Sequence, residues 1–562
     1  MSRASEMNRR GAESTASRGP GLRLRLYWKA MGFPKVRNTY TITTNVSVRM
    51  RDSALLQADL YRPAGKSKAL TVLVRTPYSR GHATTFAARF FAAQGYNVLV
   101  QSVRGIPGSE GEFEPMTRER TDGLDTVEWM RAQLWFDGRF VTYGQSYLTY
   151  TQWAIAEDAP SELKGMMLDV GPDDFAESIY GRGPMDLINF VSWSTMMSRR
   201  NEPEPGLLKI LRMIRQDAKT LRRLLTAAPL RPSMPASFDK HAPWVAEWLK
   251  HPDLTDDFWD GYRCSHALRN VRFPVLLEGG WADLFLRQTL RHWQVLHERG
   301  VDLQVRISND THTSIITKLF DGTYLKRCLA WIDGVDRDAV RVAKSPPYEA
   351  RIGGTKREVR ALEKWPPASR EHVLFPTGEG RLASAPTDRA LTHFTFDPAH
   401  PTPSVGGHTI ANDAGFQLND AVERRDDVLV FTGERLETDL VVIGHPACVL
   451  EIASTNPNHD LFVRLCDVDR SGHSRNVTDE IVRFNGDSAS DRSGARAVSV
   501  TLQGTAHRFK KGHRVRVQMS GGAFPRYSVN VGGAKGNGAR VTHTIQLGMG
   551  TATRLVLPVV EA

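Results

Sequence analysis

The residues with the clearest capacity for chemistry are a serine, an aspartate and a histidine that lie far apart in the chain. Ser146 stands in Gly-Gln-Ser-Tyr within VTYGQSYLTY (141–150), where β-branched and apolar residues lead into an apolar, aromatic-rich segment. A glycine two residues before a serine at a strand-to-helix junction is typical of a nucleophile held on a tight turn. Because Gly and Ser are also common in ordinary surface turns, the tripeptide alone does not decide between the two interpretations.

A nucleophilic serine requires a base and an acid that orients the base. Asp283 follows the apolar run FPVLLEGG (273–280), and His312 follows the run LQVRIS (303–308). The order Ser, Asp, His is that of α/β-hydrolases, and each of the three residues comes just after a predicted strand. We expect the histidine to take the serine proton and return it to the leaving group, while the aspartate fixes the tautomer of the imidazole.

The oxyanion that forms during such a reaction requires hydrogen-bond donors. The backbone N–H of Tyr147 is the first candidate, because Tyr147 directly follows the serine at the turn. The loop RTPYSRG (75–81) follows an early predicted strand, and the hydroxyl of Tyr78 in this loop is the second candidate. The alternative for Tyr78 is a packed aromatic residue after a proline turn.

Other polar residues near these positions have competing interpretations. Asp302 and Asp310 are alternatives to Asp283 as the acid, and Asp310 lies two residues before the histidine, where a local turn contact would form. His292 and His297 lie on a predicted amphipathic helix, which favours surface or core positions over a catalytic one.

The segment between residues 39 and 344 alternates between predicted strands and helices. Two alternating segments, 39–50 and 54–61, predict an antiparallel hairpin. Continuous apolar runs predict buried strands at 70–75, 97–101, 163–170, 273–280 and 303–308, with helices between them. This alternation predicts a mostly parallel sheet whose ligands bind at the carboxyl ends of the strands, where the serine, aspartate and histidine would converge.

Two other regions depart from this alternation. Between about 181 and 262 the periodicity is helical, as in 204–228 and 244–250, which indicates a helical insertion. After about 345 the helical patterns stop, and short β-rich runs recur between clusters of Gly, Asn, Asp and Pro. Such runs predict a β-sandwich or jelly roll.

Composition limits the class of protein. The chain has 562 residues, which predicts two or three domains, and its 41% hydrophobic and 24% charged residues are ordinary for a globular protein. No apolar run is long enough for a transmembrane helix, and the first residues lack the apolar region of a secretory signal. Four cysteines without CxxC spacing argue against a zinc site or a disulfide framework. We therefore expect a cytoplasmic protein with no integral membrane segment, no metal and no cofactor.

The basic charge is concentrated at the N-terminus. Residues 1–37 contain nine Lys or Arg and two Glu, a net charge of +7 out of +12 for the whole chain. This predicts a mobile basic arm over residues 1–38. The rest of the chain has no basic stripe with interleaved aromatic residues, so nucleic acid is not expected as a partner. The sequence is compatible with a homo-oligomer.

Several motifs together resemble the cocaine-esterase-like branch of the X-prolyl dipeptidyl-peptidase (S15) serine hydrolases, over roughly residues 40–560. They are VRTPYSRG, VLVQSVRGIPGSEGEFEP, GQSYLTYTQW, GGWAD, the late histidine and C-terminal stretches such as FKKGHRVRVQMSGGAFPRY. The resemblance implies a Ser146, Asp283, His312 triad and an oxyanion hole made by Tyr78 and the Tyr147 amide. It also implies a helical cap over the acyl pocket and a C-terminal jelly-roll domain.

Two residues depart from the family pattern. Thr149 stands where members commonly have glycine, and Ser102 stands in the place of an aspartate. A missing glycine in the first turn of the helix behind the serine would crowd helix–strand packing, so these changes affect the pocket shape more than the reaction. Asp59, Arg104 and Glu110 in family-like segments are expected to hold loops by charge-assisted hydrogen bonds. The acidic run Glu110, Glu112 and Glu114 in GSEGEFEP is expected to lie on a solvated loop, with binding of a cationic group as the alternative.

The sequence therefore predicts an α/β-hydrolase domain over 39–180 and 263–344, a helical cap over 181–262 and a jelly roll over 345–562. The predicted function is a serine hydrolase that cleaves carboxylic esters through an acyl-enzyme. One alternative is an acylase or X-prolyl dipeptidyl peptidase that acts on amides, which would require carboxylates that grip an α-ammonium group. A second alternative is a carbohydrate- or surface-binding protein in which the jelly roll binds and the hydrolase site is idle.

Overall fold

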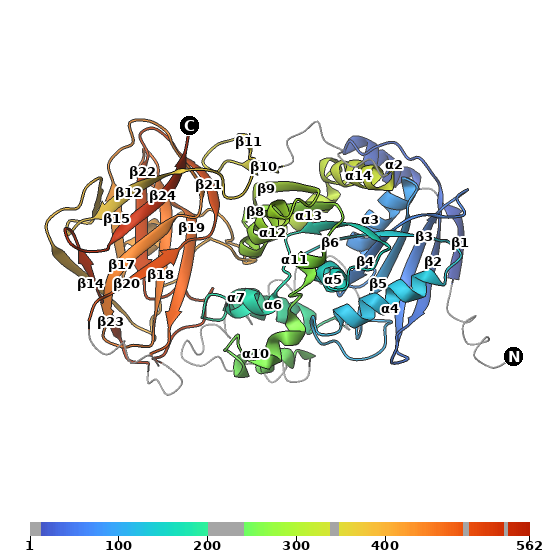
Figure 1. Cartoon of the computed structure of the whole chain (residues 1–562), viewed down its shortest axis with the longest axis horizontal. Coiled ribbons are helices and arrows are strands. Elements are labelled where there is room, and N and C mark those ends of the chain that lie inside the picture. Colours follow the sequence, from blue (N-terminus) through green and yellow to red (C-terminus); the bar gives the residue numbers. More distant parts are fainter. Residues whose placement is uncertain are drawn as a thin grey trace.

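The computed structural model describes residues 13–18, 20–200, 241–337, 348–486, 494–532 and 538–561. Two large β-sheets lie next to each other along the long axis of the molecule, one from the first part of the chain and one from its last third (Figure 1). Helices surround the first sheet, whereas the second sheet is accompanied by a single short helix in the described part of the chain, α15 (Asp420–Glu423).

The first sheet has 11 strands in the order β1-β2-β3-β5-β4-β6-β7-β8-β9-β10-β11. Its strands are β1 (Glu13–Arg18), β2 (Tyr40–Arg49), β3 (Leu55–Pro63), β4 (Ala69–Thr76), β5 (Asn97–Ser102), β6 (Phe136–Gln145), β7 (Leu163–Asp169), β8 (Val275–Ala282), β9 (Leu303–Thr311), β10 (Tyr348–Arg351) and β11 (Val359–Ala361). Neighbours from β5 to β10 run parallel, and the outer pairs at both edges are antiparallel. The predicted hairpin is formed by β2 and β3, and β4, β5, β7, β8 and β9 are the predicted buried strands.

Helices connect the parallel strands and cover the sheet. They are α2 (Leu22–Ala30), α3 (His82–Ala93), α4 (Glu119–Arg131), α5 (Tyr147–Ala156), α11 (Ala267–Asn270), α12 (Leu286–Glu298), α13 (His312–Thr317), the 3₁₀ helix η2 (Lys318–Phe320) and α14 (Gly322–Asp336). Helix α5 packs on β6, β4 and β7, and α12 packs on β8 and β9. The strands that precede Ser146, Asp283 and His312 are therefore β6, β8 and β9, which lie close together in one sheet.

Residues 20–38 are folded, which differs from the predicted mobile arm over 1–38. Trp28 on α2 is 2% exposed and packs against Phe33 and Phe90. Arg37 forms an ion pair with Asp333 on α14. The basic composition of this segment suggested a solvated arm, but its aromatic residues give it an apolar side that fixes it to the sheet domain.

A group of helices separates β7 from β8. It contains α6 (Phe175–Tyr180), α7 (Leu187–Met197), α10 (Trp244–Lys250) and the 3₁₀ helix η1 (Asp257–Tyr262), followed by α11. Helix α10 has the predicted bounds, and α6 begins before the predicted insertion over 181–262. The helix expected over 204–228 lies outside the described residues.

The second sheet has 13 strands, and almost all of its pairs are antiparallel. They are β12 (Arg370–Pro376), β13 (Arg381–Ala383), β14 (Ala390–Phe396), β15 (Val428–Gly433), β16 (Leu440–Gly444), β17 (Ala447–Ser454), β18 (His459–Val468), β19 (Ser474–Phe484), β20 (Arg496–Thr501), β21 (Thr505–Phe509), β22 (Arg514–Ser520), β23 (Val541–Leu547) and β24 (Arg554–Val560). Since β10 and β11 still pair within the first sheet, the second sheet begins after the predicted limit at 345.

Candidate active site

Ser146 lies on a strained turn between β6 and α5. Its backbone has φ 59° and ψ −122°, a region that residues with a side chain rarely adopt. Gly144 makes the turn sterically feasible, because a Cβ at this position would lie 2.3 Å from the Cβ of Leu148. The turn therefore presents the serine hydroxyl at the carboxyl end of β6, as a nucleophile on a strand-to-helix junction requires.

Thr149 is accommodated by a glycine on the neighbouring connection. A Cβ on Gly171, which follows β7, would lie 2.3 Å from the Cβ of Thr149 and 2.4 Å from the carbonyl oxygen of Ser146. The hydroxyl of Thr149 donates to the carbonyl of Asp169 at 2.8 Å and accepts from the amide of the same residue at 3.2 Å. The expected crowding at Thr149 is thus relieved by a residue that lacks a side chain, and the threonine ties α5 to β7.

His312 and Asp283 lie beside the serine. The Nε2 atom of His312 is 2.9 Å from Oγ of Ser146, and its Nδ1 atom is 2.6 Å from Oδ1 of Asp283. Asp283 is completely buried, and its second carboxylate oxygen accepts the backbone N–H of Phe285 at 2.9 Å. An imidazole between a hydroxyl and a carboxylate is able to accept the hydroxyl proton while the carboxylate stabilises the resulting cation.

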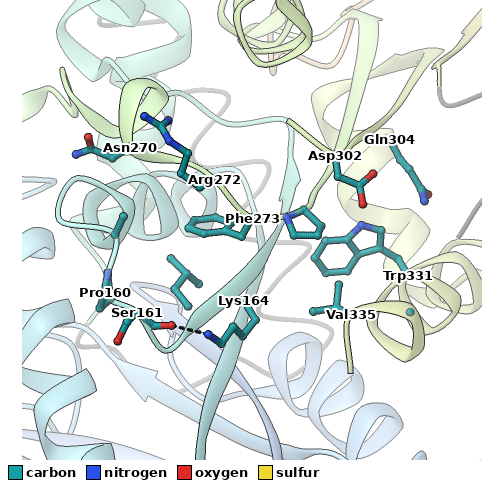
Figure 2. A pocket seen from close by; sticks show the side chains of 14 residues that line it. Pro160, Ser161, Lys164, Asn270, Arg272, Phe273, Asp302, Gln304, Trp331 and Val335 are labelled. Carbon is teal, nitrogen blue, oxygen red and sulfur yellow. Dashed lines mark hydrogen bonds between the residues drawn. The ribbon is translucent and has the colours of Figure 1, made fainter. Parts of the chain in front are cut away.

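The two alternative acids lie elsewhere. Asp302 comes before β9, whereas His312 comes after it, so this nine-residue strand of about 30 Å separates them. Figure 2 shows Asp302 in a different hollow of about 390 Å³, near Gln304 and Trp331. Asp310 instead pairs with Lys318; burial alone would raise the pKa of this carboxyl, but the hydrogen bond from Lys318 lowers it overall.

Tyr78 brings a hydroxyl to the same place. The indole N–H of Trp193 on α7 donates to the Tyr78 hydroxyl at 3.1 Å, and this hydroxyl is also hydrogen-bonded to Ser146. Desolvation raises the pKa of Tyr78 above its ordinary value, so the phenol stays protonated at neutral pH. Because the hydroxyl accepts from Trp193, its own proton is available toward the serine.

Tyr147 contributes both its backbone and its side chain. It is the first residue of α5, so its N–H has no acceptor within the helix. Its ring stacks on Trp193 with 6.0 Å between centroids, and its hydroxyl donates to Glu119 at 2.8 Å. Glu119 in turn pairs with Arg75 at 2.8 Å. The side chain of Tyr147 is therefore held both at its ring and at its hydroxyl.

A cavity of about 570 Å³ opens at these residues. Its walls come from the first sheet, from α6 and α7, from the α13–η2 region and, through Ile410, from the C-terminal part of the chain. Aromatic and aliphatic side chains dominate the walls, among them Phe175, Phe190, Trp193, Leu284, Phe285, Ile316 and Phe320. None of the lining residues within the described ranges is Asp, Glu, Lys or Arg.

The sequence did not single out Trp193. Its indole N–H brings a contact from the inserted helices to the Tyr78 hydroxyl, but a tryptophan in an aromatic-rich helix is typical of an ordinary core residue. The signal available in the sequence was the segment NFVSW (189–193), whose aromatic residues exceed what a short helix needs for packing.

The other polar residues considered in the sequence form structural contacts. His292 is buried and contacts Asp173, and His297 contacts the Tyr348 hydroxyl. Ser102 accepts from Arg80 at 2.9 Å, and the same guanidinium pairs with Asp59. Arg104 pairs with Asp122 and Asp52, and Glu110 accepts the backbone N–H of Leu55. Glu112 and Glu114, in contrast, are exposed.

Family profiles match most of the chain. The family described as X-Pro dipeptidyl-peptidase (S15 family) matches residues 52–314, and the X-Pro dipeptidyl-peptidase C-terminal non-catalytic domain matches residues 341–556. The first range contains Ser146, Asp283 and His312 with the strands that carry them. The second range covers all of the second sheet except the end of β24.

Individual relatives agree with these matches. A cocaine esterase from Rhodococcus sp. (strain MB1 Bresler) is 27% identical over 541 residues, which cover 88% of this chain and 93% of the relative. Among solved structures, an aminopeptidase from a marine sediment Thaumarchaeota archaeon has a TM-score of 0.76 at 20% identity, covering 94% of this chain and 98% of its own. An α-amino acid ester hydrolase has a TM-score of 0.68 at 19% identity, with 94% and 98% covered. The structural neighbours show an α/β-hydrolase fold with a C-terminal domain.

Proposed function

Because this chain belongs to the X-Pro dipeptidyl-peptidase (S15) family of serine hydrolases, in its cocaine-esterase-like branch, we propose that it hydrolyses neutral carboxylic esters. The reaction proceeds through an acyl-enzyme on Ser146. His312 is the general base and then the general acid, and Asp283 orients its ring. The observation that carries this proposal is the hydrogen-bonded series from Ser146 through His312 to Asp283 at the opening of an apolar cavity.

The hydrogen bonds support two successive half-reactions. In the first, His312 Nε2 takes the proton of Ser146 Oγ while this oxygen attacks the ester carbonyl carbon. The C–O bond to the alcohol then breaks, and the leaving oxygen takes the proton from His312. In the second, a water molecule gives a proton to His312 and attacks the acyl carbon. Ser146 Oγ leaves with that proton, and the carboxylic acid is released.

Tyr78 and Tyr147 are proposed to stabilise the two tetrahedral intermediates. Tyr147 follows the serine as the first residue of α5, and the Tyr78 hydroxyl is hydrogen-bonded to Ser146. A protonated phenol donates a hydrogen bond to a negative oxygen more strongly than to a neutral carbonyl, so the interaction grows as the oxyanion forms. Trp193 acts as a positioning residue, because its indole N–H fixes the Tyr78 hydroxyl.

The cavity favours esters over the amide substrates of a dipeptidyl peptidase. An α-ammonium group that enters an apolar cavity requires an opposite charge, since its desolvation costs several kcal/mol. The lining residues in the described part of the chain supply no carboxylate. A neutral, apolar acyl group fits these walls, and an ester also has a better leaving group than an amide.

We assign the finer architecture by the same reasoning. Helices α6, α7 and α10 are proposed to form the cap of the acyl pocket, because Phe175 on α6 and Phe190 and Trp193 on α7 line the cavity. The 13-stranded sheet is proposed to be a jelly roll, as its antiparallel pairing and near absence of helices in the described ranges suggest.

The first experiment is an intact-mass measurement after treatment with a fluorophosphonate, which reacts with activated serines. We expect one adduct on the wild type and on Ser471→Ala, an exposed serine far along the chain, and none on Ser146→Ala. Ester hydrolysis should fall on the order of 10³-fold or more in Ser146→Ala. An adduct on Ser146→Ala, or an unlabelled and inactive wild type, would contradict the proposal.

The second experiment compares bond type. Phenyl butyrate, butyranilide and glycyl-proline anilide are offered to the same wild-type preparation, and kcat/KM is measured for each. We expect the ester to be cleaved fastest. Faster cleavage of glycyl-proline anilide would assign the protein to the dipeptidyl peptidases.

A further inference from the structure

Helix α2 presents apolar side chains to the surroundings. Leu22 and Leu26 are one helical turn apart, and 75% and 59% of their surfaces are exposed. Trp28 is buried on the opposite side of the helix and fixes it to α3 through Phe90. Met31, just past the helix end, is 44% exposed. The helix is therefore anchored on one side while large apolar groups protrude from the other.

Basic residues surround these apolar groups. Arg23, Arg25 and Lys29 on α2 are exposed, and Lys35 follows shortly after the helix. Residues 20–38 contain no Asp or Glu. We call the outward side formed by Leu22, Leu26 and the three cations of α2 the α2 face. Protruding leucines beside Arg and Lys side chains suit an anionic membrane interface, where apolar groups enter the acyl boundary and cations contact the head groups.

The α2 face adjoins the active-site cavity. The hydroxyl of Tyr27 on α2 donates to the carbonyl oxygen of Phe320, and the ring of Phe86 packs against both residues. Phe320 lines the cavity and is 41% exposed. In Figure 1, α2 lies beside α3 and α14 at the end of the molecule away from the second sheet. Tyr27 and Phe86 thus connect α2 to Phe320 in the wall of the cavity.

The α2 face also precedes the residues that the S15 family model matches. The S15 match begins at residue 52, after α2 and β2. The folding of the first sheet explains why Trp28 and Phe33 are apolar, because they pack on α3. It does not explain the exposed leucines or the cations.

We propose that the α2 face docks on an anionic phospholipid bilayer. Leu22 and Leu26 enter the boundary between head groups and acyl chains, and Arg23, Arg25 and Lys29 lie among the lipid phosphates and carboxylates. A second copy of the chain is disfavoured as the occupant, because it would bring the same cations together. A fluid lipid surface accepts protruding leucines without a complementary groove. Docking places the apolar cavity of the hydrolase next to the bilayer, where amphiphilic esters concentrate.

Vesicle sedimentation with the full chain tests this proposal. The probes are vesicles of phosphatidylcholine with 30 mol% phosphatidylserine and vesicles of phosphatidylcholine alone. We expect binding to the anionic vesicles that weakens at high salt. The charge variant Arg23→Gln/Arg25→Gln/Lys29→Gln should lose on the order of 100-fold in affinity, and Leu22→Ser/Leu26→Ser about tenfold.

Matched variants separate the α2 face from general surface properties. Leu134→Ser/Leu391→Ser removes two exposed leucines elsewhere, and Arg424→Gln/Lys510→Gln/Lys511→Gln removes three exposed cations from the second sheet region. Both controls should bind like the wild type. Fluorophosphonate labelling and hydrolysis of a water-soluble ester should be unchanged in all four variants, which verifies their folding.

Three results would overturn the proposal: no binding to anionic vesicles, equal binding to neutral ones, or full binding by both α2 variants. Concentration-dependent dimerisation that only the α2 variants lose, without vesicle binding, would assign the face to a second copy instead.

Discussion

Asp283 holds the imidazole of His312 in one orientation. One carboxylate oxygen accepts from His312 Nδ1 and the other from the backbone N–H of Phe285, so the carboxylate has no freedom to rotate. Asparagine at this position keeps the shape but offers an N–H or a neutral carbonyl where the imidazole requires an anion. We expect Asp283→Asn to lower kcat for ester hydrolysis by on the order of 10³- to 10⁴-fold with little change in folding.

Asp310→Asn is the matched control for this substitution. Asp310 lies closer to His312 in sequence but pairs with Lys318, so its loss should leave kcat within a few-fold of the wild type. Steady-state kinetics and the rate of fluorophosphonate labelling distinguish the two variants. Equal losses in both would mean that Asp283 is not the orienting acid.

A substitution of Tyr78 tests whether this residue is an oxyanion donor or only a packed aromatic residue. Phenylalanine keeps the ring that packs against Tyr147 and removes only the hydroxyl. We expect Tyr78→Phe to lower kcat by about 10²- to 10³-fold while KM stays nearly constant, because the hydrogen bond strengthens in the transition state. Tyr27→Phe, which removes a hydroxyl bonded to a backbone carbonyl, is the control and should have wild-type kcat. An unchanged kcat in Tyr78→Phe would favour the packing role.

At the scale of single residues, the sequence predicted the three polar residues of the site but not the residues that pack around them. Ser146, Asp283 and His312 each follow a strand, and strand ends are visible as the end of an apolar run. Gly171 and Trp193 were not predicted, since the contact of each with its partner depends on packing between segments that are distant in sequence. Pairwise contacts of this kind leave no periodic signal in the chain.

At the scale of elements, the connection after β7 and the helix α5 have complementary shapes, with a glycine on one opposite a threonine on the other. Thr149 occupies the space that a side chain at residue 171 would require. We expect Gly171→Ala to reduce the free energy of unfolding by about 1–3 kcal/mol and to lower ester kcat, because the added methyl group displaces Thr149 and the Ser146 carbonyl.

A double-mutant cycle tests this coupling. Thr149→Gly removes the hydroxyl and methyl groups that the new Cβ would meet, so it should cost less in the Gly171→Ala background than in the wild type. Thermal unfolding and kcat are measured for all four proteins. Additive effects of the two substitutions would show that the residues do not share this space. Gly21→Ala serves as a control for the glycine substitution itself, because a Cβ there would meet no atom within 4 Å and the residue has φ −56°.

The elements themselves were predictable where burial follows a simple pattern. The parallel strands read as apolar runs, and α10 has the bounds that its periodicity predicted. Strand β19 has no simple apolar pattern, because it is rich in polar residues such as Asn476, Asp479 and Glu480, which are buried and paired in the structure. The N-terminal segment was misjudged for the opposite reason, since its many cations hid the aromatic residues that dock it.

At the scale of the whole molecule, the two sheets are joined by apolar and ionic contacts. Trp365, Val441 and Ile443 from the C-terminal part belong to the same apolar core as the first sheet. A buried ionic cluster adds to this junction: Asp479 on β19 pairs with Arg464 and Arg526. The backbone carbonyl of Arg526 accepts the N–H of Leu187 at the start of α7, so the cluster is linked to the helix that lines the cavity.

Asp479 is the centre of this cluster. Burial alone would raise its pKa, but Arg526 and Arg464 lower it well below the ordinary value. A carboxyl with a lowered pKa in the folded state stabilises the protein above the unfolded pKa, and this stabilisation is lost as pH falls through the folded pKa. The ion pairs are therefore fully formed at neutral pH and persist into the acid range.

Asp479→Asn removes the charge while it keeps the shape, and it leaves two buried guanidinium groups without their anion. We expect a loss of about 3–5 kcal/mol in the free energy of unfolding at pH 7. Because the cluster is linked to α7, we expect one calorimetric transition for the wild type and two for Asp479→Asn, with the β-rich part unfolding first. Asp426→Asn, at an exposed position, should unfold like the wild type. A single transition at the wild-type temperature in Asp479→Asn would mean that the apolar core alone couples the two sheets.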